Sequence, residues 1–398
     1  MDRGSHADFP LWDRNPELVY LDYASTAPKF RSALEAGQRY DRDFSANVHR
    51  ASYAIAAKAE EAYEGARRAV GRLFNVGEDH VAFTKGTTEA INLVASCWLS
   101  QAQPGDKVLV TQAEHHANYV SWFHAAERNG VEVLVAPIQL DGTLDQEAYL
   151  ALLDQGPTIA AFTRTSNVTG VSFPVAWMAA EAKRRGVATL VDAAQAAPHE
   201  RIHFQEWGVD FLVCSAHKMY GPTGVGALIA SPTRFDELPP YHGGGGMIES
   251  VSSDGIRYVS GARKFEAGTP PIAAAIGFGA ACQELAARLT ASALADRTSQ
   301  MERLLTGLAS LGAVTAGPPP ADGHLVSFTV PGAHPFDLAT WLDQRQICVR
   351  DGQHCAHPLH QALGLTATLR VSLGLPTSDE EVERFLESLA WAIGKVRR

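Results

Sequence analysis

The sequence predicts an α/β protein with two domains: a large domain built on a mostly parallel sheet flanked by helices, and a smaller α+β domain toward the C-terminus. Short, continuously apolar runs alternate with helix-like stretches from about residue 65 to residue 230. Such strands are typical of a parallel sheet that helices cover on both faces. The 398 residues also exceed what one hydrophobic core usually organises. We therefore expect a large domain over residues 20–275 and a small domain that combines residues 1–19 with residues 276–398.

Each strand of the large domain is predicted from an apolar run bounded by polar or turn residues. One helix is expected to begin at Thr87, and another includes the stretch from Trp122 to Arg128. The run 224–230 follows a turn containing Gly and Pro, and we interpret it as an edge strand. The other expected strands cover residues 79–84, 107–111, 131–136, 158–163, 187–192 and 210–214.

The rest of the chain, residues 241–398, has a different pattern. Residues 241–271 are expected to form a loop or hairpin, and the Ala- and Leu-rich stretch 272–311 predicts long helices. A last helix is expected over residues 378–395, because Ser378 and Glu381 have the spacing of a capping box. Strands of the small domain are expected at residues 325–330, 347–350 and 369–373.

Composition excludes several classes of function. The chain has 34 Lys and Arg against 44 Asp and Glu, which gives a formal net charge of −10. An acidic balance without a basic run argues against binding nucleic acid or an anionic membrane surface. No apolar stretch reaches the roughly 18 residues of a membrane span, and the first residues lack the apolar core of a secretory signal. The expected location is the cytoplasm.

The five cysteines are scattered and include no C-x-x-C pair, which fits neither a disulfide framework nor a zinc site. We therefore expect no metal site. Cys97, Cys214 and Cys348 lie in apolar runs, as buried thiols do. Cys355 lies instead among polar residues, Gly and Pro, which predicts a loop, and its cationic neighbours favour the thiolate.

Polar side chains follow the predicted strands at the edge of the sheet where ligands gather in parallel sheets. The set includes hydroxyls, imidazoles, amides, one carboxylate and one lysine, which together suit a phosphorylated heteroaromatic aldehyde. These residues are Gly86, Thr87, Thr88, Glu114, His115, His116, Ser166, Asn167, Asp192, Gln195, Ser215, His217 and Lys218.

Each of these residues also has an ordinary structural explanation. Thr87 begins a helix whose N–H groups suit a phosphate, but the same position is a common N-cap. Asp192 follows an apolar strand and is expected to meet a cationic partner such as a pyridinium nitrogen; a helix cap or a buried ion pair is the ordinary explanation. Lys218 could form a Schiff base or extend to solvent. His115 suits ring stacking or proton transfer, whereas His116 fits a structural role.

The ordered motifs resemble those of the Suf-type (type II) cysteine desulfurases, which belong to the class V aminotransferase group of fold-type I enzymes dependent on pyridoxal 5′-phosphate (PLP). The resemblance runs almost from end to end. It is carried by residues 7–10, 20–22, 46–50, 83–90, 114–118, 166–170, 191–195, 215–224, 263–270 and 350–356, and by Arg370.

This resemblance implies a PLP cofactor, L-cysteine as substrate and L-alanine as product. Lys218 would bind the cofactor as a Schiff base and move the substrate's Cα proton, and the Cys355 thiolate would take the sulfur as a persulfide. His115 would stack on the cofactor ring, Asp192 would pair with its nitrogen and Gln195 would bond to its phenolate oxygen. The phosphate would be held by Thr87, Thr88, Ser215, His217 and the partner subunit's Thr269, and the substrate by Asn167, Arg350 and Arg370.

The resemblance also implies a homodimer and a sulfur-acceptor protein, in iron–sulfur cluster assembly or in the synthesis of a sulfur metabolite. A PLP-dependent C–S lyase or a selenocysteine lyase on the same scaffold is the alternative, and Cys355 favours the desulfurase. A non-enzymatic sulfur scaffold is disfavoured because Lys218 is present. The chain departs from the usual family pattern at Ala51, Arg164, Asp351 and Gln353.

Overall fold

The computed structural model describes residues 6–49, 52–318 and 323–397. The large domain contains a seven-stranded sheet in the order β2-β8-β7-β6-β5-β3-β4. All neighbouring strands are parallel except β8, which runs antiparallel to both β2 and β7. Their bounds are β2 Val81–Thr84, β3 Lys107–Thr111, β4 Glu132–Ala136, β5 Ile159–Thr163, β6 Ala188–Asp192, β7 Phe211–Ser215 and β8 Gly226–Ala230.

The expected edge position of the run 224–230 is wrong. After β7, a short 3-10 helix, η3 (Ala216–Lys218), and a turn bring the chain back beside β7, and β2 takes the edge. Gly226 permits this close packing, because a Cβ there would lie 2.4 Å from Cys214 O and 2.6 Å from Gly86 Cα. The strand is therefore internal, and all five of its residues are buried.

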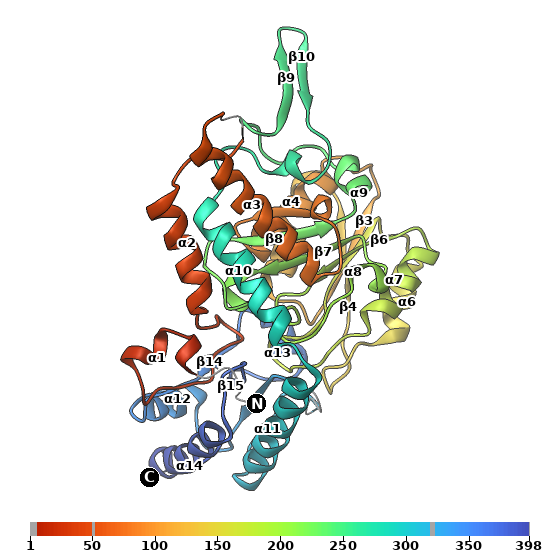
Figure 1. Ribbon diagram of the computed structural model, residues 1–398. Helices are drawn as coiled ribbons and strands as arrows, with labels where there is room; N and C mark the ends of the chain where they lie inside the picture. The colour runs from red at the N-terminus through yellow and green to blue at the C-terminus, as the bar shows by residue number, and fades with distance from the viewer. Residues whose placement is uncertain (1–5, 50–51, 319–322, 398) are drawn as a thin grey trace.

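Helices cover both faces of this sheet, as the apolar strands predict (Figure 1). Successive residues of β7 show the division, because Leu212 and Cys214 pack into one core while Phe211 and Val213 pack into the other. The helices around the sheet are α2 Arg31–Asp43, α3 Ala54–Leu73, α4 Thr87–Leu99, α5 His116–Asn129, α6 Gln146–Leu153, α7 Val175–Arg184, α8 Phe204–Trp207, α9 Pro232–Glu237 and α10 Ile272–Arg288.

The small domain contains an antiparallel sheet in the order β11-β12-β15-β14 with its own hydrophobic core. The N-terminal segment joins it, because β1 (Val19–Tyr20) pairs in parallel with β13 (Ile347–Cys348). The domain limits at residues 20 and 275 stay a prediction. The other elements are α1 Leu11–Arg14, α11 Ala291–Ser310, β11 Val314–Thr315, β12 Leu325–Thr329, α12 Pro335–Asp343, β14 Arg350–Gly352, α13 His357–Ala362, β15 Thr368–Ser372 and α14 Asp379–Val396.

Two expectations about local structure are confirmed. The capping box at the start of α14 is present, since Glu381 N donates to Ser378 Oγ and Ser378 N donates to the Glu381 carboxylate. The segment 241–271 contains a hairpin of β9 (Ile248–Ser252) and β10 (Gly255–Tyr258), which projects from the large domain (Figure 1). Within the described residues, no single helix is long and apolar enough to cross a membrane. Only the pair α10 and α11 passes by length and composition, and it is bent by 82°.

Candidate active site

A cavity of about 170 Å³ lies where strands of the large sheet end and the small domain begins. Every residue for which the family resemblance implies a cofactor, substrate or sulfur-transfer role lines it except Thr269, which is exposed elsewhere, whereas Gly86, Glu114, His116 and Ser166 do not line it. Residues more than 280 positions apart in the chain, such as Thr87 and Arg370, thus line one cavity. The predicted residues around it are Thr87, Thr88, His115, Asn167, Asp192, Gln195, Ser215, His217, Lys218, Arg350, Cys355 and Arg370.

Hydroxyl groups gather at the N-terminus of α4, on one side of the cavity. Gly86, the N-cap, has a φ of +152°, a conformation that favours glycine. Ser215 Oγ accepts a hydrogen bond from Thr87 N at 2.8 Å and donates to Thr87 Oγ1 at 2.8 Å. The helix dipole and these hydroxyls together make an anion-binding environment.

Lys218 and the buried Asp192 both line the cavity, and their opposite charges interact. Asp192 ends β6, and its carboxylate accepts a hydrogen bond from Ala194 N at 2.9 Å. Burial raises the pKa of Asp192, and the charge of Lys218 opposes that change. Burial lowers the pKa of Lys218 to about 8. Lys218 Nζ makes no hydrogen bond to any described residue, so its amine is free to react.

His115 is the N-cap of α5, and its Nδ1 accepts a hydrogen bond from Ala117 N at 3.0 Å. Burial and the nearby charge of Lys218 lower the pKa of His115 to about 3, so the ring is neutral at pH 7. The preceding Glu114 is fully buried and accepts hydrogen bonds from Thr111 Oγ1, Asn118 Nδ2 and Thr163 N at 2.5, 2.7 and 3.0 Å. These bonds tie the start of α5 to the sheet.

Two arginines lie side by side in the small domain, because Arg350 of β14 pairs in register with Arg370 of β15. Arg370 donates to Asn167 O at 2.9 Å, to Ser25 Oγ at 2.7 Å and to Asp22 Oδ1 at 3.1 Å. Its Nε is buried and has no hydrogen-bond partner in the described structure. Arg350 also donates to Ser25 Oγ, at 2.6 Å. This part of the cavity suits a carboxylate.

The cysteine loop, residues 353–356, brings an exposed thiol to the cavity. His354 and Cys355 have φ of +50° and +56°, and Cys355 O accepts a hydrogen bond from His116 N at 2.7 Å. Asn167 Nδ2 donates to His354 O at 2.7 Å. The loop is thereby attached to the large domain at two points.

The expectation that the neighbours of Cys355 are cationic is wrong for His354. Burial lowers the pKa of His354 to about 2, so this imidazole carries no charge at pH 7. The cations that line the cavity with Cys355 are Lys218, Arg350 and Arg370.

The departures from the family pattern lie around the site or outside it. Asp351 is in β14, opposite Leu369, and Gln353 is half-buried in the cysteine loop. Arg164 pairs with Glu200 at 2.8 Å and does not line the cavity. Ala51 lies outside the described residues.

Two residues next to the site were not predicted from the sequence. Ser25 binds both cavity arginines, and its only signal was the nearby motif at residues 20–22. His324 lies within 3.3 Å of Gln195 Oε1 through its Nε2. His324 directly precedes β12, whereas the residues predicted for the site were those that follow strands.

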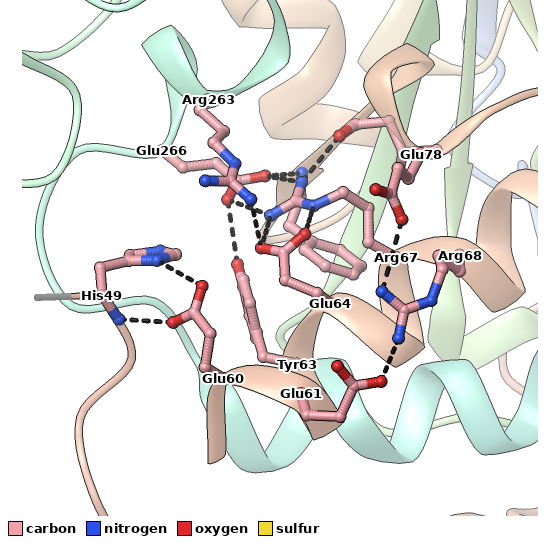
Figure 2. A network of polar contacts seen from close by, with 12 residues as sticks. His49, Glu60, Glu61, Tyr63, Glu64, Arg67, Arg68, Glu78, Arg263 and Glu266 are labelled. Atoms are coloured by element: carbon pink, nitrogen blue, oxygen red, sulfur yellow. Dashed lines mark hydrogen bonds and ion pairs between the residues drawn. The ribbon is translucent and has the colours of Figure 1, made fainter. Parts of the chain in front are cut away.

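A buried ion pair holds the segment that carries Thr269 (Figure 2). Arg67 of α3 donates two hydrogen bonds to Glu266, at 2.6 and 2.8 Å. The Glu266 carboxylate also accepts from Phe83 N at 2.7 Å and from Tyr63 Oη at 3.0 Å. The chain three residues before Thr269 is therefore fixed to the large domain.

Figure 2 also shows His49, Glu60 and Glu64, whose potential ligand atoms lie within 4.8 Å of one another. Glu64 is already paired with Arg67 at 3.0 Å and with Arg263 at 3.2 Å. His49 bonds to Glu60 through both its backbone N and its Nδ1. Because protein partners occupy these groups, we assign them no metal.

Comparison with known proteins decides the family. Residues 19–385 match the family described as aminotransferase class-V. This chain belongs to the class V aminotransferase family. It is 42% identical over 389 residues to a probable cysteine desulfurase of Xylella fastidiosa strain Temecula1, covering 96% of this chain and 93% of the relative. It is 38% identical to a cysteine desulfurase of Enterobacter sp. strain 638, covering 96% of each chain.

Solved structures agree with these relatives. The apo structure of a cysteine desulfurase from Thermococcus onnurineus NA1 matches with a TM-score of 0.94 at 33% identity, covering 99% of both chains. The cysteine desulfurase CsdA from Escherichia coli matches with a TM-score of 0.89 at 35% identity, covering 98% of both chains. The predicted fold class and the predicted function, a cysteine desulfurase, are confirmed.

Proposed function

We propose that this chain converts L-cysteine to L-alanine with PLP and carries the released sulfur as a persulfide on Cys355. The observation that carries the proposal is the position of an exposed cysteine in the same cavity as Lys218, Asp192 and His115. The thiol can thus reach a substrate in the cavity and also meet an acceptor from solvent.

The side chains around the cavity fit PLP. An amine without a hydrogen-bond partner among the described residues, Lys218, suits the aldehyde. The buried Asp192 suits the pyridine nitrogen, and the neutral ring of His115 suits stacking. Gln195 would bond to the phenolate oxygen. The phosphate would be held by Thr87, Thr88, Ser215 and His217, with Thr269 of the partner subunit in a homodimer.

When bound, PLP supplies an electron sink for the bonds at the substrate's Cα. Asp192 would pair with the ring nitrogen, and its negative charge would maintain that sink. Arg370, Arg350 and Asn167 hold the substrate carboxylate, which sets the direction of the Cα–H bond. Lys218 then takes the Cα proton and returns one, since its lowered pKa makes the neutral amine accessible near pH 7.

Cys355 carries out the sulfur transfer. Its thiolate attacks the substrate's sulfur, so that an S–S bond forms and the Cβ–S bond breaks, with the electron pair of that bond left on carbon. Proton return to the carbon skeleton gives alanine. The substrate carbon is reduced, and the sulfur leaves as a persulfide on Cys355, so no external oxidant is required. A sulfur-acceptor protein would then take the sulfur by thiol exchange.

The test compares Cys355→Ala with Cys348→Ala, a half-buried cysteine outside the cavity. Both variants are incubated with L-cysteine and a thiol reductant, and alanine and sulfide are measured. We expect Cys355→Ala to bind PLP but to lose alanine and sulfide formation, while Cys348→Ala keeps both. Undiminished sulfide release with pyruvate from Cys355→Ala would contradict the proposal and favour a C–S lyase.

A further inference from the structure

We propose that His324 is a positioning residue for Gln195: its Nε2–H holds the Gln195 carboxamide in the orientation that directs an amide N–H toward the cofactor's phenolate oxygen. This inference rests on the proposed function, in which Gln195 contacts that oxygen. It assigns a role to a residue that does not line the cavity and that the sequence analysis did not single out.

The Gln195 carboxamide has contacts of opposite polarity on its two ends. Its Nε2 donates to Ala24 O at 2.8 Å, and its Oε1 lies 3.3 Å from His324 Nε2. A carboxamide can rotate and exchange its N and O ends, but here both contacts favour the same orientation. The second hydrogen on Nε2 remains for a group in the cavity, which Gln195 and Ala24 both line.

The contact defines the proton on His324. Because the Gln195 oxygen can only accept, His324 must be protonated at Nε2. Burial and the charge of Arg297 hold the pKa of His324 well below its ordinary value, so the ring is neutral and carries one N–H. That N–H is therefore on the nitrogen that faces Gln195.

The His324 ring is held in place from behind. It stacks on His199 with ring centroids 3.7 Å apart and an interplanar angle of 21°. Arg297 of α11 donates to His199 O at 3.1 Å and approaches His199 Nδ1 at 3.4 Å. His324 O accepts a hydrogen bond from Leu373 N at 2.7 Å. Because both rings are almost fully buried, His324 has little freedom to turn away from Gln195.

Loss of this N–H has a defined consequence. An amide N–H that points toward the phenolate oxygen stabilises the negative charge on that oxygen. The lysine-bound cofactor therefore loses its proton at a lower pH. If the carboxamide turns and presents its oxygen, the charge is no longer stabilised. The pH at which the visible absorption of the lysine-bound cofactor changes then rises.

The experiment uses the PLP-loaded protein and four variants: His324→Leu, His324→Gln, Gln195→Ala and the double variant His324→Leu with Gln195→Ala. A matched control, Gln300→Leu, removes a buried polar group that bonds only to residues outside the cavity. The readouts are the pH midpoint of the visible absorption and the dissociation constant of PLP. We expect His324→Leu to raise the midpoint by about one pH unit and to weaken PLP binding roughly tenfold. His324→Gln, which can still donate an N–H, restores much of both.

The double variant separates positioning from a general structural role. If His324 acts through Gln195, adding His324→Leu to Gln195→Ala shifts the midpoint no further. A full additional shift in the double variant, or an unchanged midpoint in His324→Leu, would overturn the inference. Absence of any visible band in the unmodified chain would overturn the proposed function with it.

A second measurement uses the unmodified chain, so it does not depend on whether a variant folds. In ¹⁵N NMR of the histidine-labelled unmodified chain, we expect His324 to be the neutral Nε2–H tautomer. Protonation at Nδ1 alone would overturn the inference.

Discussion

At the scale of single residues, the chemistry of the cavity depends on which of its side chains carry a charge at pH 7. Lys218 interacts with the charge of Asp192 and makes no hydrogen bond within the described structure, whereas the rings of His115 and His354 are kept neutral. At pH 7 a lysine with a pKa of about 8 has roughly one amine in ten unprotonated, against roughly one in three thousand for an ordinary lysine. A neutral amine is therefore available at Lys218 without a separate base.

The pH dependence of cofactor uptake tests this account of Lys218. Only the unprotonated amine attacks an aldehyde, so the rate at which the cofactor-free protein gains its visible absorption should rise with pH around a midpoint of about 8. Stopped-flow absorbance measures that rate, with Lys218→Ala as the control that gains no band. A rate that rises only above about pH 10 would show an ordinary lysine.

Arg370→Lys tests the carboxylate site. A lysine keeps the charge but loses the planar fork and the separate bonds to Asn167 O, Ser25 Oγ and Asp22 Oδ1. We expect the KM for L-cysteine to rise roughly tenfold or more in steady-state assays of alanine formation. Arg303→Lys, on the exposed face of α11, is the matched control. An unchanged KM in Arg370→Lys would remove this residue from the substrate site.

At the scale of elements, the site depends on close packing of backbone where β7, β8 and α4 meet. Gly226 at the start of β8 lies against the backbone of Cys214 and of Gly86, the N-cap of α4. Neither neighbour is a flexible side chain that can move aside. The same packing that makes β8 an internal strand therefore positions the N-terminus of α4, where we propose that the phosphate binds.

Gly226→Ala should destabilise both the sheet and the site. The added Cβ would lie 2.4 Å from Cys214 O, and relieving that contact should cost about 1–3 kcal/mol of the free energy of unfolding. We expect a lower thermal-unfolding midpoint and weaker PLP binding. The control is Gly243→Ala, where an added Cβ would meet nothing within 4 Å. If both variants melt together with the unmodified chain, the packing argument is wrong.

At the scale of the whole molecule, the sequence predicted the strands well and their arrangement less completely. Buried runs such as 187–192 and 210–214 are recognisable because both faces of the sheet are covered. The position of β8 depends on a long-range pairing, which an apolar run does not encode. His324 was not predicted for a similar reason, since its contact with Gln195 joins residues 129 positions apart. Cys355 and Lys218 were predicted because motif order carried information that single residues lacked.

The predicted homodimer would give Thr269, which follows the hairpin in the chain, a role in binding the cofactor of the partner subunit. Thr269 is exposed and follows Glu266, which Arg67 holds in the large domain. We expect sedimentation to give the mass of a dimer and Thr269→Ala to weaken PLP binding several-fold, because one hydrogen bond to the phosphate is lost. Ser253→Ala, at the exposed tip of the hairpin, should leave binding unchanged. A monomeric chain with full PLP affinity would refute the role of Thr269.

The proposed reaction depends on transfer of sulfur from the substrate to Cys355. The most direct measurement is a single turnover with L-cysteine and no reductant, followed by intact mass, peptide mapping and alanine quantitation. We expect each active site to gain one sulfur atom, located on Cys355, and to form one alanine. Pyruvate and free sulfide without protein-bound sulfur would contradict it.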